Sequence, residues 1–320
     1  MKFFSIKNLI KTLVLAVVIY AALLFIGDYN KISSQLSHLN LLVIPVILSL
    51  VFLENLISFY QWNFLLKRLD IKVPLKVSFL IFFSGLSMVI TPAKVGEVLK
   101  SYLLKKSEGI KIRKSIMVVV FERLVDLLSL AILALIGSFA FIRNLYFQIL
   151  ILILISVLSF IFILLTNRRM FFKFSSILNR IPFIKKYVKY LDQIYQSSTT
   201  LISFKTLIVV LPLSTFGWFL ECLSFYLLLN ALNVSLQILP ATFIFSFSSV
   251  FGSATLIPGG LIAAESSFVA LLLLQKITLA TATLATILIR LLTLFWGFSM
   301  GVIALFFTNK LLKKKGKSIK

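Results

Sequence analysis

The stretch PATFIFSFSSVFGSATLI-PGG-LIAAESSFVALLLLQ, residues 240–275, decides how this chain folds. An apolar run, 240–257, meets Pro258, Gly259 and Gly260, and a shorter apolar run, 262–275, follows. At about 1.5 Å per helical residue, the second run covers about two-thirds of a ~30 Å hydrocarbon core. We therefore predict a re-entrant helical hairpin, which enters and leaves the membrane on one side and has its tip at Pro258–Gly260.

A second stretch with the same organisation lies nearer the N-terminus. Residues 75–92 are apolar and end at Pro92, and residues 95–106 follow as a short amphipathic run that begins near Gly96. This pattern predicts a second re-entrant hairpin. Pro and Gly also serve any ordinary bend in a chain, so these tip residues carry a purely structural interpretation as well.

Six other segments are apolar and long enough to cross a bilayer. The composition agrees, because 60% of the residues are hydrophobic and 13% are charged. In soluble globular proteins about half of the residues are apolar and about a quarter are charged. The first segment has a basic flank, but no small-residue cleavage site follows it, so we expect a retained span and not a cleaved signal. The six segments are 9–28, 41–66, 115–141, 147–166, 205–230 and 279–308.

The net charge of +23 could indicate a nucleic-acid partner, but the placement of the basic residues favours a membrane. With both hairpins re-entrant, 27 of the 33 Lys and Arg residues fall on the side of the N-terminus. Cytoplasmic loops carry such an excess, so we expect a multi-pass protein of the cell (inner or cytoplasmic) membrane with both termini cytoplasmic. Basic and aromatic residues alternate in 168–190, which fits either an interfacial segment attracted to anionic lipids or an ordinary cytoplasmic loop.

Four anchors recur at a spacing of 166 to 168 residues, which indicates an internal repeat. We predict one membrane domain, 1–320, with repeat one at 41–141 and repeat two at 205–308. The span 147–166 and a basic segment, 167–204, join them and invert the second repeat. Inverted repeats with broken helices are typical of transporters, although a duplicated scaffold without transport stays an alternative. The matched pairs are Glu54 with Glu221, Pro92 with Pro258, Glu97 with Glu265, and Arg123 with Arg290.

Six of the ten acidic residues lie inside predicted membrane segments, where an ionised carboxylate is costly unless it is paired or faces water. Arg123 and Asp126 are three residues apart and share a helix face. Buried ion pairs that lock the helices are one interpretation. The other is a polar cavity for an anionic head group, because Arg holds phosphate in a fork and helix N-termini at the tips favour anions. The predicted charge partners or proton acceptors are Glu54, Glu97, Glu122, Asp126, Glu221 and Glu265, and the predicted head-group ligands are Arg123, Arg290, Lys94 and Lys100.

Motifs for metal, nucleotide or cofactor chemistry are absent from the sequence. His38 is the only histidine and Cys222 the only cysteine, and there is no phosphate-binding glycine loop. We therefore expect no metal, no cofactor and no ATP-driven transport by this chain alone. Membrane carboxylates could still act as bases, so an embedded lipid transferase stays open.

The motif set resembles the lysylphosphatidylglycerol synthase transmembrane family, flippase-like membrane proteins of the UPF0104 type. The matching stretches are PAKVGE (92–97) with YLL (102–104), ERLVD (122–126), PGG (258–260) with Glu265, and RLL (290–292). The family usually has Arg where Lys100 stands, a second Gly near Ile262, and often Arg where Gln61 precedes Trp62.

The resemblance implies a membrane protein that handles anionic lipids. It implies no aminoacylation here, because only about a dozen residues follow 308 and we expect no soluble synthase domain. We expect flipping of a phospholipid or an isoprenoid-phosphate-linked lipid between leaflets. The alternative is a non-transporting partner of a lipid-modifying enzyme or glycosyltransferase.

Overall fold

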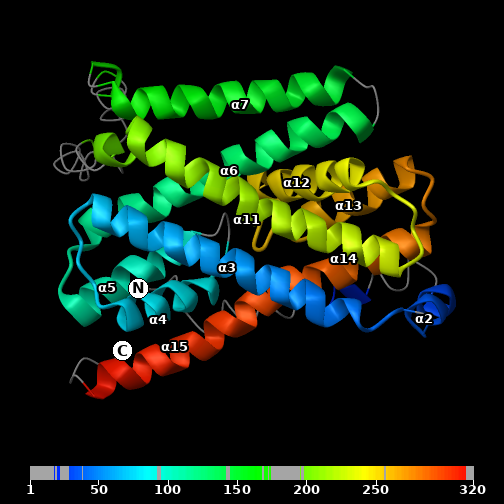
Figure 1. Cartoon of the computed structure of the whole chain (residues 1–320), viewed down its shortest axis with the longest axis horizontal. Helices are drawn as coiled ribbons and strands as arrows, with labels where there is room; N and C mark the ends of the chain where they lie inside the picture. Colours follow the sequence, from blue (N-terminus) through cyan, green and yellow to red (C-terminus); the bar gives the residue numbers. More distant parts are fainter. Residues whose placement is uncertain are drawn as a thin grey trace.

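The protein is all-α and polytopic (Figure 1). A computed structural model describes 18, 20–21, 29–37, 39–91, 95–141, 145–167, 169–171, 173, 195, 198–255 and 257–314. Every secondary-structure element in these ranges is a helix. The predicted fold class of an all-α polytopic membrane protein is therefore confirmed.

Five helices are long and apolar enough to cross a membrane, and they correspond to five of the six predicted spans. The remaining predicted span, 9–28, lies outside the described residues except at positions 18, 20 and 21. The last crossing is one continuous helix from Leu279 to Lys314. The long helices are α3 (Val43–Arg68), α6 (Ile112–Phe141), α7 (Leu145–Thr166), α11 (Phe204–Ala231), and α14 (Leu279–Arg290) continued by η4 (Leu291–Phe295) and α15 (Trp296–Lys314).

Short helices occupy the two predicted hairpins, and within each hairpin they pack against each other. Their re-entrant course through a bilayer stays a prediction. A further short helix, α2 (Tyr29–Ser37), lies beside α14. The hairpin helices are α4 (Leu75–Leu86), η2 (Val95–Val98) and α5 (Leu99–Glu108) in the first, and α12 (Ile238–Ala254) and α13 (Ala263–Leu274) in the second.

Helix α4 ends at Leu86, before the predicted boundary at Pro92. The backbone N–H groups of Ser87 and Met88 bond to carbonyls three residues back, so the helix tightens into turns. The Ser87 hydroxyl donates to the Ser84 carbonyl at 2.7 Å, which competes with the regular helical pattern. The hydroxyl-rich sequence at this end thus stops the helix ahead of the proline.

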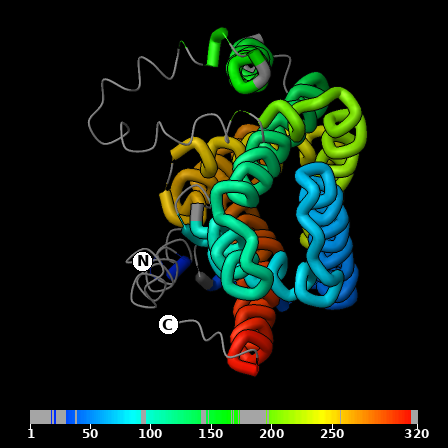
Figure 2. Tube along the Cα trace, turned by 90° about the vertical axis from the view of Figure 1, so that its left-hand side faces the viewer, coloured from blue at the N-terminus to red at the C-terminus, as the bar shows by residue number. Residues whose placement is uncertain are grey.

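The two halves interlock through their hairpins. The order long helix, short helices, long helix occurs in both halves. In the middle, α3 packs against α11, while α12 packs against α6 and α4 against α15. Each hairpin therefore rests on the last long helix of the other half (Figures 1 and 2). The duplication of the chain as a repeat stays our interpretation of this order.

Glycines allow these cross-half contacts to be close. A Cβ on Gly137 of α6 would lie 2.6 Å from the Phe243 backbone nitrogen of α12. A Cβ on Gly301 of α15 would lie 2.1 Å from the Ser87 backbone nitrogen beyond α4. Only a residue without a side chain lets the backbones approach this closely, as is common where membrane helices cross.

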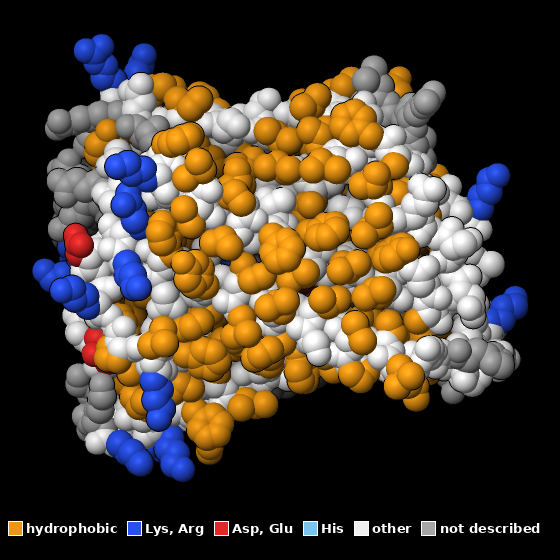
Figure 3. All heavy atoms as spheres, viewed as in Figure 1, with side chains coloured by type: hydrophobic (Ala, Val, Ile, Leu, Met, Phe, Trp, Pro, Cys, Tyr) orange, Lys and Arg blue, Asp and Glu red, His pale blue; other side chains and the backbone are white. Residues whose placement is uncertain are grey.

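The surface shows the expected membrane belt. Hydrophobic side chains cover the middle of the molecule in Figure 3, while Lys and Arg gather at one end and are sparse at the other. Helix α7 packs mainly against α6 and lies at the edge of the bundle (Figures 1 and 2). Its apolar side chains are mostly exposed, which suits contact with lipid.

The last crossing contains a π-helical turn. Residues Leu291–Phe295 form it directly after Arg290, and regular α-helix resumes at Trp296. The Thr293 hydroxyl donates to the Ile289 carbonyl at 2.8 Å across this segment. Single π-helical turns inside membrane helices frequently lie at functional sites.

Candidate functional site

A cavity of about 130 Å³ lies between the two halves. Because a water molecule takes about 30 Å³ of liquid volume, the space suits about four waters or a small polar group. Both halves contribute charge to its wall, and the tip of the second hairpin closes part of it. The charged residues that line it are Glu54, Glu97, Arg123, Asp126, Glu221 and Arg290.

The two hairpin tips meet beside this cavity. Gly259 and Gly260 have φ values of +64° and +65°, which glycine adopts without a steric cost. A Cβ on Gly259 would lie 3.8 Å from Cα of Ile90, at the tip of the first hairpin. The tips are therefore neighbours in space although they are far apart in sequence.

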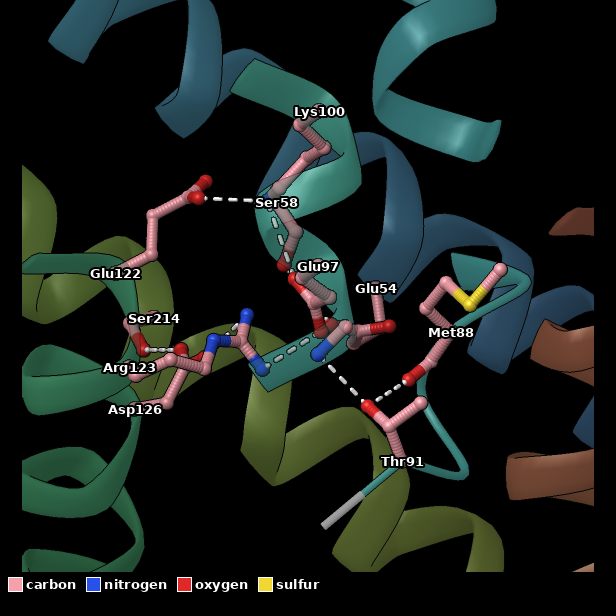
Figure 4. Close-up of polar contacts among 11 residues, drawn as sticks. Glu54, Ser58, Met88, Thr91, Glu97, Lys100, Glu122, Arg123, Asp126 and Ser214 are labelled. Atoms are coloured by element: carbon pink, nitrogen blue, oxygen red, sulfur yellow. Dashed lines mark hydrogen bonds and ion pairs between the residues drawn. The ribbon is translucent and has the colours of Figure 1, made fainter. Parts of the chain in front are cut away.

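Five charged side chains form what we call the first ionic cluster: Glu97, Lys100, Glu122, Arg123 and Asp126 (Figure 4). Lys100 Nζ lies 2.7 Å from Glu122 Oε2 and 3.2 Å from Glu97 Oε2. Arg123 Nη1 lies 3.2 Å from Glu97 Oε1, and its Nη2 lies 2.9 Å from Asp126 Oδ2. Glu97 thus joins the lysine to the arginine, and the cluster is one connected network.

The lysine of this cluster is enclosed by aromatic rings. Lys100 Nζ lies 4.7 Å from the ring centre of Trp62 and 5.2 Å from that of Phe82, where each ring face attracts a cation. A Cβ on Gly85 would lie 2.6 Å from Lys100 Cγ, so glycine makes room for the lysine stem. Lys100 is 1% exposed and lies behind the cavity wall.

Serine hydroxyl groups on α3 and α11 donate hydrogen bonds to two acidic residues of the cavity wall. Ser214 of α11 donates to Asp126 Oδ1 at 2.9 Å. Ser58 donates to Glu54 Oε1 at 2.9 Å on α3. A Cβ on Gly217 would lie 3.6 Å from Glu54 Cγ, so Glu54 packs over a glycine where α3 and α11 cross.

Thr91 fixes the tip of the first hairpin. Its Oγ1 accepts the Gly96 backbone N–H at 2.8 Å and donates to the Met88 carbonyl at 2.6 Å (Figure 4). A Cβ on Gly96 would lie 2.6 Å from the same oxygen, so the position needs glycine. This bond holds η2, which carries Glu97, against the end of α4.

The second ionic cluster consists of Glu265 and Arg290 with the Gly259 carbonyl and the Tyr20 hydroxyl. Arg290 Nε donates to Glu265 Oε1 at 2.8 Å, and its Nη2 donates to the Gly259 carbonyl. Tyr20 donates to Glu265 Oε1 at 3.5 Å, and its ring meets that of Phe295 edge-on at 5.7 Å. Arg290 therefore ties the tip of the second hairpin to the last crossing.

The structure brings most of the predicted site residues together. The predicted charge partner Glu265 holds Arg290, while Glu122 and the predicted head-group ligand Lys100 lie behind the wall. Gly259 and Gly260 line the cavity, next to Pro258. Lys94 and Pro92 lie outside the described residues, as does most of the basic–aromatic segment 168–190.

Sequence reasoning missed several polar members of this site. Ser58 lies four residues after Glu54, so helical spacing could have identified it. Thr91, Ser214 and Tyr20 come from other elements, and no pattern in the sequence predicts their contacts. Among the described residues, no group of His, Cys, Asp and Glu could hold a metal ion.

These features define a multi-pass α-helical membrane protein in which two helical hairpins meet at a charged, half-enclosed cavity. The family model described as lysylphosphatidylglycerol synthase TM region matches residues 13–301. The chain therefore belongs to this family. It is also 28% identical over 232 residues to a UPF0104 membrane protein of Methanocaldococcus jannaschii, a match that covers 72% of this chain and 97% of the relative.

Proposed function

We propose that the protein moves a phosphate-bearing lipid between the two leaflets of the membrane. The substrate is a phospholipid or an isoprenoid phosphate that carries a sugar. The observation that carries the proposal is one cavity lined by Arg123 and Arg290, one guanidinium from each half. This arrangement supports the proposal, since guanidinium groups match the geometry of phosphate.

The size and position of the cavity support a path for the head group alone. Ligand sites that enclose whole small molecules measure about 300–1,000 Å³, so a space of about 130 Å³ accepts only part of a lipid. The lipid tails would stay in the bilayer beside the bundle. Movement of the hairpin tips, which carry Glu97 and the Gly259 carbonyl, would open the cavity to one leaflet and then to the other.

The distribution of basic side chains supports an orientation in the cell membrane. The end of the bundle rich in Lys and Arg would face the cytoplasm. Exposed basic residues at the loops between α3 and α4 and between α5 and α6 belong to this group, as do those at the end of α15. Both termini would then be cytoplasmic.

Leaflet-resolved lipid movement in reconstituted vesicles tests the proposal. The intact protein should move a fluorescent phospholipid between leaflets. Arg123→Ala and Arg290→Ala should each reduce the rate at least tenfold, because a lost charge-assisted bond costs about 1.5–3 kcal/mol. The matched control Arg113→Ala changes an exposed arginine near the start of α6. Wild-type rates in the double variant would reject the assignment.

The burial of the first ionic cluster favours a second candidate, a non-transporting partner that docks a lipid-modifying enzyme or glycosyltransferase. Glu97, Lys100 and Glu122 are almost fully buried and bonded to one another, as expected for ion pairs that lock helices. This candidate predicts that vesicles with the wild-type protein show no lipid movement, and that the cavity stays closed to both leaflets.

A further inference from the structure

The charges around the cavity do not balance. Six carboxylates lie in membrane segments against four basic side chains, even when Lys94, outside the described residues, is counted. Full ionisation therefore leaves an excess of two negative charges in a region that solvates charge poorly. A phosphate-bearing head group adds at least one more. The four basic side chains are Lys94, Lys100, Arg123 and Arg290.

An exchange of partners does not remove this excess. Arg123 is bonded to Glu97 and Asp126, and Arg290 to Glu265. A phosphate that takes over either guanidinium leaves a buried carboxylate without its counter-charge, which is strongly unfavourable. The negative charge that the head group adds is offset only if a cation enters with the anion.

Among the described residues, one carboxylate oxygen of the second ionic cluster lacks a hydrogen-bond donor. Glu265 is 1% exposed, and within the described part of the chain its Oε2 accepts no hydrogen bond. Buried polar atoms in folded proteins usually have a partner. The second ionic cluster therefore solvates its negative charge incompletely.

Two carboxyl groups are placed to exchange protons with water in the cavity. Glu54 of α3 and Glu221 of α11 both line it, at matched positions in the two halves. Both residues are half-buried, whereas Glu97, Glu122 and Glu265 are almost fully buried. Glu54 and Glu221 are therefore more accessible to a proton from solvent than Glu97, Glu122 and Glu265; Asp126 is also half-buried, but it is held by Arg123 and Ser214.

The groups around these two carboxyls are mostly acidic. Helix α4 and the π-helical segment η4 contribute only uncharged side chains to the cavity. Proton uptake by Glu54 or Glu221 lowers the repulsion among the remaining carboxylates, because like charges at short range disfavour joint ionisation. The charged groups that line the cavity with them are Glu97 from η2, Arg123 and Asp126 from α6, and Arg290 from α14, which is paired with Glu265 of α13.

We propose that a phosphate-bearing head group and a proton enter the cavity together, and that Glu54 and Glu221 take up the proton. A carboxylate gains a proton from water as the anion binds and returns it to water when the anion leaves. A pH difference across the membrane then sets the direction of net lipid movement. The proposal rests on the phosphate site of the proposed function, but it concerns binding and is testable without transport.

Calorimetric binding of dihexanoyl phosphatidylglycerol to the full-length protein in detergent tests this step. This phosphodiester keeps one negative charge near neutral pH, so its own titration does not interfere. Titrations in two buffers of different ionisation enthalpy count the protons exchanged. We expect uptake of about one proton per lipid. The affinity should fall on the order of tenfold for each unit by which the pH rises.

Conservative variants locate the proton. Glu54→Gln and Glu221→Gln should each lower the uptake, and the double variant should bind with an affinity that no longer depends on pH. The matched control is Asp70→Asn, an exposed acid-to-amide change at φ +52°, a conformation that asparagine tolerates. The wild-type titration needs no variant, so it stands even if a variant fails to fold.

The outcomes separate this inference from the proposed function. Lipid binding by the wild type without proton uptake overturns the inference and leaves lipid movement intact. Proton-linked binding without movement in vesicles overturns the transport function alone. No binding at any pH overturns both. Unchanged uptake in the double variant overturns the assignment to Glu54 and Glu221.

Discussion

The two ionic clusters occupy matched positions in the two halves but differ in content. Each has a Glu–Arg pair at the wall of the cavity, built around Arg123 or Arg290. The first adds Lys100, Glu122 and Asp126, whereas the second adds only a carbonyl and a tyrosine hydroxyl. Both halves thus contain the Glu–Arg pair, whereas the additional charged residues occur only in the first half.

The second half has apolar side chains at the positions that match Lys100 and Glu122. Phe268 lies 168 residues after Lys100, is 1% exposed, and packs against Phe225 at 5.3 Å between ring centres. Ile289 lies 167 residues after Glu122 and is fully buried. Buried ion pairs and well-packed apolar groups of similar volume often stabilise a fold about equally. The comparison therefore indicates that Lys100 and Glu122 serve packing more than ligand binding.

The largest expected effect comes from the glutamates of the shared pair. Glu265→Leu removes the only carboxylate that Arg290 contacts among the described residues, and it should destabilise the protein by about 3–5 kcal/mol, because a buried charge is left without its counter-charge. Glu97→Leu removes a carboxylate that two cations share, but Lys100 keeps Glu122 and Arg123 keeps Asp126, so the loss should be about half as large. Melting temperatures in detergent measure both.

A paired change serves as the control for this comparison. Lys100→Met combined with Glu122→Leu removes one charge of each sign. It places apolar side chains where the second half has Phe268 and Ile289. It should cost less than Glu265→Leu alone. Equal losses of stability from Glu97→Leu and Glu265→Leu would show that the two clusters stabilise the fold equally. That result would contradict the difference expected from their ion pairs.

An intermediate effect is expected at the crossings between halves. Gly301→Ala and Gly137→Ala push a methyl group into backbone atoms of α4 and α12, and each should cost about 1–3 kcal/mol through overpacking. Gly301 has the closer approach, so its loss should be the larger. The readout is the melting temperature in detergent.

Gly297→Ala is the matched control, since a Cβ there meets nothing within 4 Å. It should be neutral or stabilising by up to about 1 kcal/mol, as expected for alanine in a helix. A loss at Gly297 equal to that at Gly301 would mean that helix propensity, and not the contact between halves, explains the glycines.

The smallest expected effect is a gain at the second hairpin tip. Ile262 precedes α13 with φ +71°, a conformation that costs a β-branched residue about 1–3 kcal/mol. Ile262→Gly should therefore stabilise the protein by about 1 kcal/mol after the entropy cost of glycine. Asn233→Gly, at φ +59° after α11, is the control and should gain less, because asparagine tolerates this region. No gain at Ile262 would show that the strain is relieved elsewhere.

Sequence reasoning predicted what depends on local composition and spacing. The long apolar runs gave five of the crossings, and the three-residue spacing of Arg123 and Asp126 predicted their contact, which the structure shows at 2.9 Å. The resemblance placed a glycine near Ile262, and the positive φ there gives the physical reason. These features need no knowledge of how distant segments pack.

Contacts between distant segments could not be read from the sequence. Lys100 was predicted as a head-group ligand from its charge and position, and its enclosure by Trp62 and Glu122 depends on how α3, α5 and α6 pack. The early end of α4 follows from side-chain hydroxyls that compete with helical bonds. The meeting of Ile90 with Gly259 follows from the docking of one half on the other.

The π-helical turn at Leu291–Phe295 sets how the last crossing tolerates changes in length. Each residue of an α-helix advances the phase by about 100°. Arg290 before the turn faces the hairpin tip, and Gly301 after it faces α4, so one insertion or deletion between them would rotate one of these faces away from its contact. The number of residues between Arg290 and Gly301 is therefore constrained by two separate contacts.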